Sequence, residues 1–534
     1  MVLESIKYNR KFDTIKLNNM FKYGLDHLTV GKAISILNGE LKAAISTEAE
    51  ERIRKAHEIV IKTALKDKAV YGINTGFGPL CDTIISKNDT TELQRKILLS
   101  HSVGVGAPID KDLAKLMLIL KVHSLSQGFS GISMAVLERI QWHIEQDIIP
   151  MVPEQGSVGA SGDLAPLSHL FLPLIGEGKV MYKNKVRKTK KVLEKEGLEP
   201  LTLHPKAGLA LINGTQFILA HAIMCVDKLY NCLSHADLIG SLMIEGLMGS
   251  QMPFHELLHQ TRPFKANIHV AKRINQFLQG SEIGKSHLFC GKVQDPYSLR
   301  CMPQVHGSSR NAWLHLKENV EIELNSVTDN PVIISDELII SGGSFHGQPL
   351  ALPLDYACLA AAEIGSISDR RTYLSLEGKY EGTPRLLMED TGINSGFMIL
   401  QYTSAALVSE NKGLCFPSSA DSIPTSLGQE DHVSMGSIGG RKALRVIDNL
   451  EKILAIELLC AAQAFDFRKP LKSSEVLDDV HDTIRERIDF ASEDRIFSID
   501  IEKAIELIKE RELLSTASFH ADTYSEYDNL FESY

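Results

Sequence analysis

The spacing of apolar residues along the C-terminal two thirds of the chain predicts long helices. Beyond residue 208, apolar positions recur every three or four residues over long segments interrupted by polar and glycine-containing stretches. The predicted helical segments are 208–247, 308–325, 351–373, 395–412 and 440–466. Segments of this length and polarity pack against one another as a bundle of antiparallel helices.

The N-terminal part has a more mixed pattern. Helical spacing at 30–66, before residue 100 and at 110–148 is interrupted by glycine-containing loops at 70–80, 102–108 and 152–166. Residues 180–186 alternate as a small hairpin with Lys183-Asn184 at its turn, and residues 331–340 read as strands. We therefore expect a mainly α fold, with an N-terminal domain at 1–225 that bears the glycine-rich loops and a helical bundle with C-terminal helices and tail at 226–534.

Composition narrows the functional classes. The chain has 534 residues, of which 44% are hydrophobic and 23% charged, and no stretch approaches the roughly 20 uncharged apolar residues of a membrane span. A net charge of −10 argues against nucleic-acid binding. The N-terminal residues lack the pattern of a secretory signal, and the 8 cysteines form no C-x-x-C pair. We expect a cytoplasmic protein that acts on a small molecule, with no membrane or nucleic-acid partner.

One motif points to a different chemistry. The sequence HELLH at 255–259 fits the H-E-x-x-H pattern, in which two histidines on one helix face bind zinc. A zinc site needs a third ligand, and the following QTRPFKANIH lacks the G-x-x-H continuation, although Glu282 could serve from a distance. A zinc peptidase is thus the weaker reading, and a short surface helix without metal is the stronger one.

A different loop offers an unusual electrophile. In Ala160-Ser161-Gly162, the Gly162 nitrogen carries no side-chain obstruction and could be bent onto the Ala160 carbonyl if the fold forced that approach. Ring closure with loss of the Ser161 hydroxyl would leave a conjugated alkene on a five-membered ring. Taken from the residues alone, the three positions would be just a loop.

The run GSVGASGDLAPLSH at 156–169 resembles the signature of the histidine and phenylalanine ammonia-lyase family. In that family, Ala-Ser-Gly cyclises by itself to 4-methylidene-imidazol-5-one. Further segments resemble the family in the same order: YGINTGFG (71–78), SHSVGVG (100–106), LINGTQ (211–216), VQDPYSLRCMPQVHG (293–307), TDNP (328–331), SGGSFHG (341–347), NSGFMILQYTSAAL (394–407) and SIPTSLGQEDHVSM (422–435). The resemblance implies a mainly helical homotetramer whose active sites each draw on three chains.

The resemblance also implies catalytic roles. The prosthetic group from Ala160, Ser161 and Gly162 would be the electron sink that ammonia elimination requires, with no metal. Tyr71 would remove the β-proton, and Arg300 would grip the substrate carboxylate through two parallel hydrogen bonds. The remaining matched positions are Asn213 and Gln294, which supply amide groups, Tyr297 near the carboxylate, and Phe345 as an aromatic wall.

Substrate choice depends on fewer positions. Ser100-His101 matches the Ser-His pair of histidine lyases, and Glu430 and Met398 match the same branch, whereas phenylalanine lyases generally have Gln at the position of Glu430. A histidine and a carboxylate suit an imidazole ring, which offers a donor and an acceptor. Some tyrosine lyases also carry Ser-His, and Ser344 and Gly428 stand where Asn is common. The expected reaction converts L-histidine to trans-urocanate and ammonia.

Other activities remain open at this stage. A tyrosine or phenylalanine ammonia-lyase, or an aminomutase that returns the ammonia to the β-carbon, would share the same motifs. From other classes, the zinc peptidase suggested by HELLH and a catalytically silent helical scaffold stay as alternatives.

Overall fold

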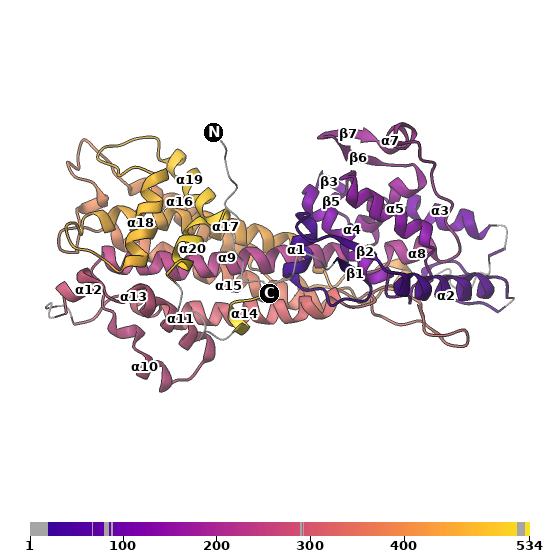
Figure 1. Ribbon diagram of the computed structural model, residues 1–534, viewed down its shortest axis with the longest axis horizontal. Coiled ribbons are helices and arrows are strands. Elements are labelled where there is room, and N and C mark those ends of the chain that lie inside the picture. The colour runs from indigo at the N-terminus through magenta and orange to yellow at the C-terminus, as the bar shows by residue number, and fades with distance from the viewer. Residues whose placement is uncertain are drawn as a thin grey trace.

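The computed structural model describes residues 20–66, 68–78, 85–86, 89–288, 291, 293–520 and 529–534. The prediction made on the N-terminal segment 1–19 lies outside the described residues, as do residues 79–80 of the first predicted loop and 521–528 of the tail. The molecule is elongated, with the N-terminal part at one end, the C-terminal helices at the other, and long helices that join the two (Figure 1).

The N-terminal part combines short helices with small sheets. Its helices are α1 (Val30–Leu37), α2 (Thr47–Ala64), α3 (Thr90–His101), α4 (Lys111–Leu125), α5 (Met134–Glu145), α6 (Leu164–Phe171), α7 (Thr189–Glu196) and α8 (Ala207–Ile212). Its strands are β1 (Phe21–Tyr23), β2 (Ala43–Ile45), β3 (Val105–Pro108), β4 (Ile149–Pro150), β5 (Pro153–Gln155), β6 (Lys179–Tyr182) and β7 (Lys185–Lys188). β1 pairs with β2 in parallel, and β3–β5, β4–β6 and β6–β7 pair antiparallel.

Five long helices form the central bundle: α9 (Gln216–Gly246), α14 (Met302–Leu324), α15 (Gln348–Ser375), α16 (Met398–Leu414) and α17 (Gly436–Asp466). The small hairpin β8 (Val332–Ile333) and β9 (Ile339–Ile340) precedes α15. Shorter helices cover the distal end of the bundle: α10 (Glu256–Gln260), α11 (Lys265–Phe277), α12 (Glu282–Ser286), α13 (Tyr297–Arg300), α18 (Glu475–Arg487), α19 (Phe497–Lys509) and α20 (Glu512–Ser518). The mainly α prediction is confirmed.

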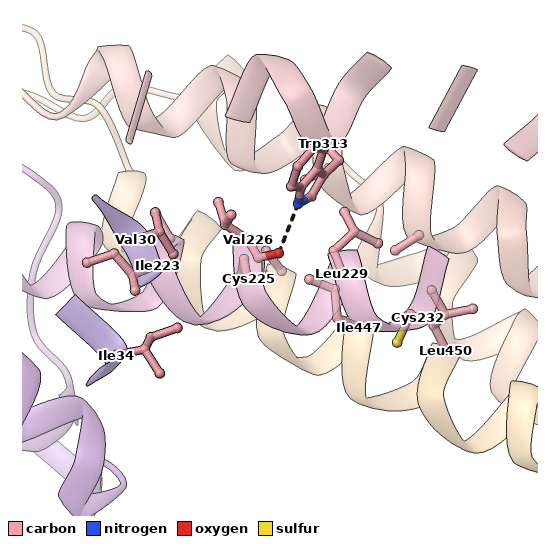
Figure 2. Packing of buried hydrophobic residues seen from close by; sticks show 14 of the residues in the cluster. Val30, Ile34, Ile223, Cys225, Val226, Leu229, Cys232, Trp313, Ile447 and Leu450 are labelled. Atoms are coloured by element: carbon pink, nitrogen blue, oxygen red, sulfur yellow. Dashed lines mark hydrogen bonds between the residues drawn. The ribbon is translucent and has the colours of Figure 1, made fainter. Parts of the chain in front are cut away.

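The bundle is held by apolar side chains from α9, α14 and α17. Figure 2 shows Val226 and Leu229 of α9 beside Ile447 and Leu450 of α17, all of them fully buried. Trp313 of α14 packs on the other side, and its indole N–H donates to the Val226 carbonyl oxygen at 2.9 Å (Figure 2). Such burial contributes about 25 cal/mol per Å² of apolar surface, so this seam fixes the relative positions of the helices.

Two of these helices, α9 and α15, are apolar and long enough to cross a membrane by length and composition, but most of each is buried inside the protein. Both are therefore accounted for as core helices, which pass the same test of length and hydropathy.

Several predicted helices are interrupted in the structure. The segment 30–66 is divided by strand β2, and 110–148 is divided between α4 and α5 at residues 126–133. The segment 208–247 is divided between α8 and α9 at residues 213–215. In each case the apolar spacing continues across the break, so periodicity alone did not mark it. The division of the chain near residue 225 stays a prediction, and α9 runs through that residue.

Other local predictions are confirmed. The hairpin turn falls at Lys183-Asn184, where both residues have positive φ (48° and 57°), as a type I′ turn requires. The basic residues of β7 are exposed, as expected for a solvated turn. Residues 331–340 contain the predicted strands.

Residues 529–534 of the tail dock onto the bundle. The Glu532 carboxylate contacts the Arg273 guanidinium at 2.9 Å and accepts a hydrogen bond from the Tyr230 hydroxyl at 3.0 Å. The Tyr534 hydroxyl donates to Asp227 at 2.6 Å. Burial raises the pKa of Glu532, but Arg273, His269 and Arg310 together lower it to about 2. These ionic and hydrogen-bonded contacts hold residues 529–534 against α9 and α11.

Candidate active site

The glycine-rich loop at 156–163 has an unusual backbone. Positive φ angles occur at Gly156 (135°), Gly159 (76°), Ser161 (49°) and Gly162 (78°). Only Ser161 among them carries a side chain, and the left-handed conformation costs such a residue roughly 1–2 kcal/mol. A side-chain-bearing residue held in this region by the surrounding fold is typical of functional sites.

A close approach of two backbones holds this loop. Gly162 pairs with Gly214 as an isolated parallel bridge, and the Asp163 amide donates to the Gly214 carbonyl oxygen at 2.7 Å. A Cβ atom placed on Gly162 would lie 2.0 Å from that same oxygen. Only glycine can therefore occupy position 162 without moving the 213–215 segment.

The Ser161 carbonyl oxygen receives donors from the break between α8 and α9. The Asn213 side-chain amide donates to it at 2.9 Å, and the Gly214 backbone amide lies at 3.4 Å. Asn213 is only 3% exposed, and its own Oδ1 atom has no hydrogen-bond partner within the part of the chain that the structure describes. A buried acceptor of this kind suits an incoming donor, such as a substrate amine.

The Ser161 hydroxyl is held from the opposite side by Glu430. It donates to one carboxylate oxygen of Glu430 at 2.6 Å. The other carboxylate oxygen accepts from the hydroxyls of Thr425 at 2.9 Å and Ser426 at 2.8 Å, which fixes the orientation of the carboxylate. The loop that carries Glu430 is tied to the glycine-rich loop where the Met435 amide donates to the Val158 carbonyl oxygen at 2.9 Å.

Asp163 links the glycine-rich loop to the first turn of α9. Its fully buried carboxylate accepts hydrogen bonds from the Phe217 and Ile218 amides, both at 3.0 Å, in the first turn of α9. Exposed amides at a helix N-terminus stabilise a negative charge. Burial raises the pKa of Asp163 to about 7, against the lowering effect of its hydrogen bonds.

Three further predicted residues lie at this end of the molecule. His101 ends α3 and is half-buried, with its Nδ1 atom 2.9 Å from the Ser100 hydroxyl. Burial lowers the pKa of His101, while the Ile97 backbone and the charge of Glu430 act in the opposite direction. His101 is therefore held mainly neutral near Glu430, as a ring that recognises a polar substrate group requires.

Tyr71 and Phe345 are both half-buried. The Tyr71 phenol oxygen accepts a hydrogen bond from the Gly78 amide at 3.4 Å. Phe345 comes two residues before Gly347, which packs against Ile218 of α9 and Ser434 of the Glu430 loop. Phe345 thus belongs to the same end of the bundle as Ser161.

The remaining predicted residues lie elsewhere. Gln294 and Tyr297 are exposed, and the Arg300 guanidinium stacks on the Tyr297 ring at 4.7 Å while its Nε atom donates to the Asp295 carbonyl oxygen. Met398 begins α16, beside the contact of Phe397 with Phe497 of α19.

The length of α14 separates these residues from the glycine-rich loop. Arg300 stands two residues before the first turn of α14, whereas Glu323 in the last turn accepts a hydrogen bond from Thr215, beside Asn213. At about 1.5 Å per residue, the 23 residues of α14 span roughly 35 Å. One chain therefore brings together Ala160, Ser161, Gly162, Asn213, Glu430 and His101, and does not bring Gln294, Tyr297, Arg300 or Met398 to them.

Two buried charged residues next to the loop and the 213–215 segment, Asp163 and Lys121, were not among the candidates from the sequence. Lys121 is 1% exposed and interrupts the apolar run LMLILKVHSL at 116–125 of α4. An amine inside such a run is the signal that could have drawn attention to it, because lysine is almost never fully buried without a partner.

The HELLH motif forms only the short helix α10. The His255 Nδ1 atom accepts from the Leu257 amide, and the His259 Nε2 atom bonds to the Pro253 carbonyl oxygen at 2.8 Å. Among the described residues, no group of three or more His, Cys, Asp or Glu side chains could hold a metal ion. The geometry gives the zinc reading no support.

The helical bundle that carries this glycine-rich loop is the fold of a known family of lyases. Residues 28–486 match the family model described as "Aromatic amino acid lyase". The chain is 43% identical over 491 residues to "Histidine ammonia-lyase" of Myxococcus xanthus, covering 92% of this chain and 97% of that protein. This chain belongs to the aromatic amino acid lyase family, which depends on methylidene-imidazolone.

Solved structures agree in fold. The crystal structure of histidine ammonia-lyase from Trypanosoma cruzi matches with a TM-score of 0.88 at 37% identity, covering 96% of this chain and 97% of that chain. The structure of tyrosine aminomutase from Streptomyces globisporus matches with a TM-score of 0.88 at 32% identity, covering 94% and 99%. The shared fold therefore spans members with different reactions.

We expect Gly162→Ala to lower the free energy of unfolding more than Gly197→Ala. Both glycines have positive φ, but a Cβ atom meets nothing within 4 Å at Gly197, whereas at Gly162 it meets the Gly214 backbone. The additional loss should be about 1–3 kcal/mol, as for overpacked sites. Denaturation midpoints followed by circular dichroism measure the difference, and equal losses would contradict the close approach of residues 162 and 214.

Proposed function

We propose that this chain is a histidine ammonia-lyase that converts L-histidine to trans-urocanate and ammonia. The observation that carries the proposal is the position of Ser161 between the Asn213 amide and the Glu430 carboxylate, in a left-handed backbone conformation. Full-length relatives named histidine ammonia-lyase support the choice of substrate. The cytoplasmic localisation of the protein stays a prediction.

We propose that Ala160, Ser161 and Gly162 condense to 4-methylidene-imidazol-5-one. The Gly162 nitrogen bonds to the Ala160 carbonyl carbon, and that oxygen leaves as water with the amide hydrogens of Ser161 and Gly162. The Ser161 hydroxyl then leaves as a second water with the Ser161 Cα hydrogen. The group, once formed, supplies an electron-poor carbon that no ordinary side chain offers.

The residues at the site fit this group. The strained φ of Ser161 and the glycine at 162 allow the tight turn that ring closure needs, and the two donors at the Ser161 carbonyl oxygen lie where negative charge collects when the Cα hydrogen is removed. Glu430 accepts from the hydroxyl that has to leave.

The other side chains bind and orient the substrate in this proposal. Tyr71 takes the β-proton, and the Oδ1 atom of Asn213, which has no partner among the described residues, accepts from the substrate amine. His101 and Glu430 hydrogen-bond the imidazole ring, for which a neutral histidine and a carboxylate are suitable partners. Arg300 pairs with the substrate carboxylate. The walls of the substrate pocket are completed by Gln294, Tyr297, Phe345 and Met398.

We also propose a homotetramer with shared active sites. The roughly 35 Å between Arg300 and the electrophile loop is too long for one amino acid to bridge, so Arg300 has to come from another copy. The exposure of Tyr297 (71%) fits a surface that a neighbouring copy covers. The alternative of an aminomutase is supported by the similarity to tyrosine aminomutase, and it is separated from a lyase by its products.

The first prediction from the proposed function concerns the mass of the chain. The purified chain should weigh two water molecules less than its translated sequence and show additional near-ultraviolet absorbance, because both waters leave during condensation. Ser161→Ala should restore the translated mass and remove the absorbance. Ser308→Ala, on the exposed face of α14, is the matched control and should behave as the wild type. An active wild-type chain of unmodified mass would refute the proposed electrophile.

The second prediction concerns substrate choice. The wild type should prefer histidine over phenylalanine by a factor of up to ~10⁴, because an apolar ring leaves the polar groups of His101 and Glu430 unpaired. His101→Phe combined with Glu430→Gln should shift this ratio toward phenylalanine even if absolute rates fall. Product analysis by chromatography over histidine, tyrosine and phenylalanine measures it. Faster turnover of tyrosine, or a β-amino acid product, would favour the alternatives.

The third prediction tests shared sites. Ser161→Ala and Arg300→Ala chains should each be inactive alone, but co-expression should restore activity, because some sites then combine an intact Ser161 from one chain with an intact Arg300 from another. If the two kinds of chain mix at random, Ser161 is intact in half of the sites and Arg300 in half of the sites, so about a quarter of the sites have both. No recovery in purified mixed assemblies would show that both residues serve within one chain.

A further inference from the structure

Lys121 is a buried amine that the proposed reaction does not use. It lies on α4, and its Nζ atom donates to the Asn213 carbonyl oxygen at 2.6 Å and to the Gln216 Oε1 atom at 3.3 Å. Across the residues that the structure describes, no carboxylate lies within 4.0 Å of this nitrogen. Lys206, a second buried lysine nearby, instead pairs directly with Asp329 at 2.6 Å.

A buried cation without a contacting carboxylate is costly, so its position calls for a reason beyond packing. Burial lowers the pKa of Lys121 to about 7. The charges that act on it come from Asp329, which raises this pKa, from Lys206, which lowers it, and from Asp163, which raises it. Both carboxylates thus favour the protonated amine.

The contact made by Lys121 leads directly to the electrophile loop. The carbonyl oxygen that accepts from Lys121 belongs to the same peptide group as the Gly214 amide, which faces the Ser161 carbonyl oxygen at 3.4 Å. Hydrogen bonds that share a peptide group polarise one another. A cation bound to the Asn213 carbonyl oxygen therefore makes the Gly214 N–H of the same peptide group a stronger donor. The side chain of Asn213, held by the same contact, donates to the same oxygen at 2.9 Å.

We propose that Lys121 is a positioning residue for the electrophile, which polarises the Asn213–Gly214 peptide group toward the Ser161 carbonyl oxygen and so promotes the dehydration of residues 160–162. This inference rests on the proposed function. Loss of the Ser161 Cα hydrogen places negative charge on the Ser161 carbonyl oxygen, and donors aimed at that oxygen lower the barrier. The hydrogen and the hydroxyl still leave together as one water, and no other reactant is needed.

The test follows dehydration itself rather than turnover. Full-length chains are synthesised in a short pulse, and intact mass spectrometry measures the fraction that is two waters lighter over time. Lys121→Met removes the charge and the donor, and it should slow dehydration about ten-fold or more. Removing an oxyanion donor outright costs roughly 10²–10³, and an indirect effect should be smaller. The near-ultraviolet absorbance should appear with the same delay.

Two control variants on α4 separate this role from general stability. Lys115→Met makes the same substitution at a partly exposed ion pair with Asp147, and it should dehydrate at the wild-type rate. Leu118→Ala opens a cavity at a residue that is 1% exposed, so it should lower the melting temperature without slowing dehydration. If Leu118→Ala slows dehydration as much as Lys121→Met, the effect reflects stability alone and the proposal is overturned.

Lys121→Gln separates charge from hydrogen bonding. It keeps a donor for the Asn213 carbonyl oxygen but carries no charge, so it should also slow dehydration, and it serves if Lys121→Met fails to fold. Wild-type rates in both variants would overturn the role of Lys121 and leave the proposed function intact. A wild-type chain that never loses two waters would instead refute the proposed function.

Discussion

The contact between the Gly162 and Gly214 backbones is the constraint on which the site depends. It can form only if α8 ends before residue 213 and α9 begins after residue 215, because a continuous helix would use those amides and carbonyls internally. The break gives Ser161 its donors, and it leaves the first amides of α9 free for Asp163. A local loss of helix is thus compensated by hydrogen bonds to a second loop.

The bundle determines where the chemistry can take place. The buried seam of α9, α14 and α17 holds the glycine-rich loop at one end, while α14 places Arg300 at the other. Rigid helices of this length leave little freedom to bring the two ends together by bending. An arrangement of copies side by side would bring the two ends together without deforming any chain, which is why the geometry of one chain favours the proposed assembly.

Periodicity predicted the long helices well, because the burial of one apolar face determines their extent: the predicted 351–373 lies within the observed Gln348–Ser375. It failed at 213–215, where a contact with a loop some 50 residues earlier outweighs local propensity. Candidate site residues were chosen through motifs, but motifs carry no distances, and the separation of Arg300 from Ser161 needed the structure. Asp163 and Lys121 were missed because their roles arise from burial, which single positions in a sequence do not display.

The hydrogen bond between Ser161 and Glu430 can exist only before the proposed condensation. In the newly folded chain this carboxylate oxygen is occupied by the serine hydroxyl, and the proposed condensation removes that hydroxyl. The oxygen then becomes vacant for a ring N–H of the substrate. Maturation and recognition would in this way be consecutive uses of one acceptor, so in the proposed reaction the substrate site would be complete only after the condensation.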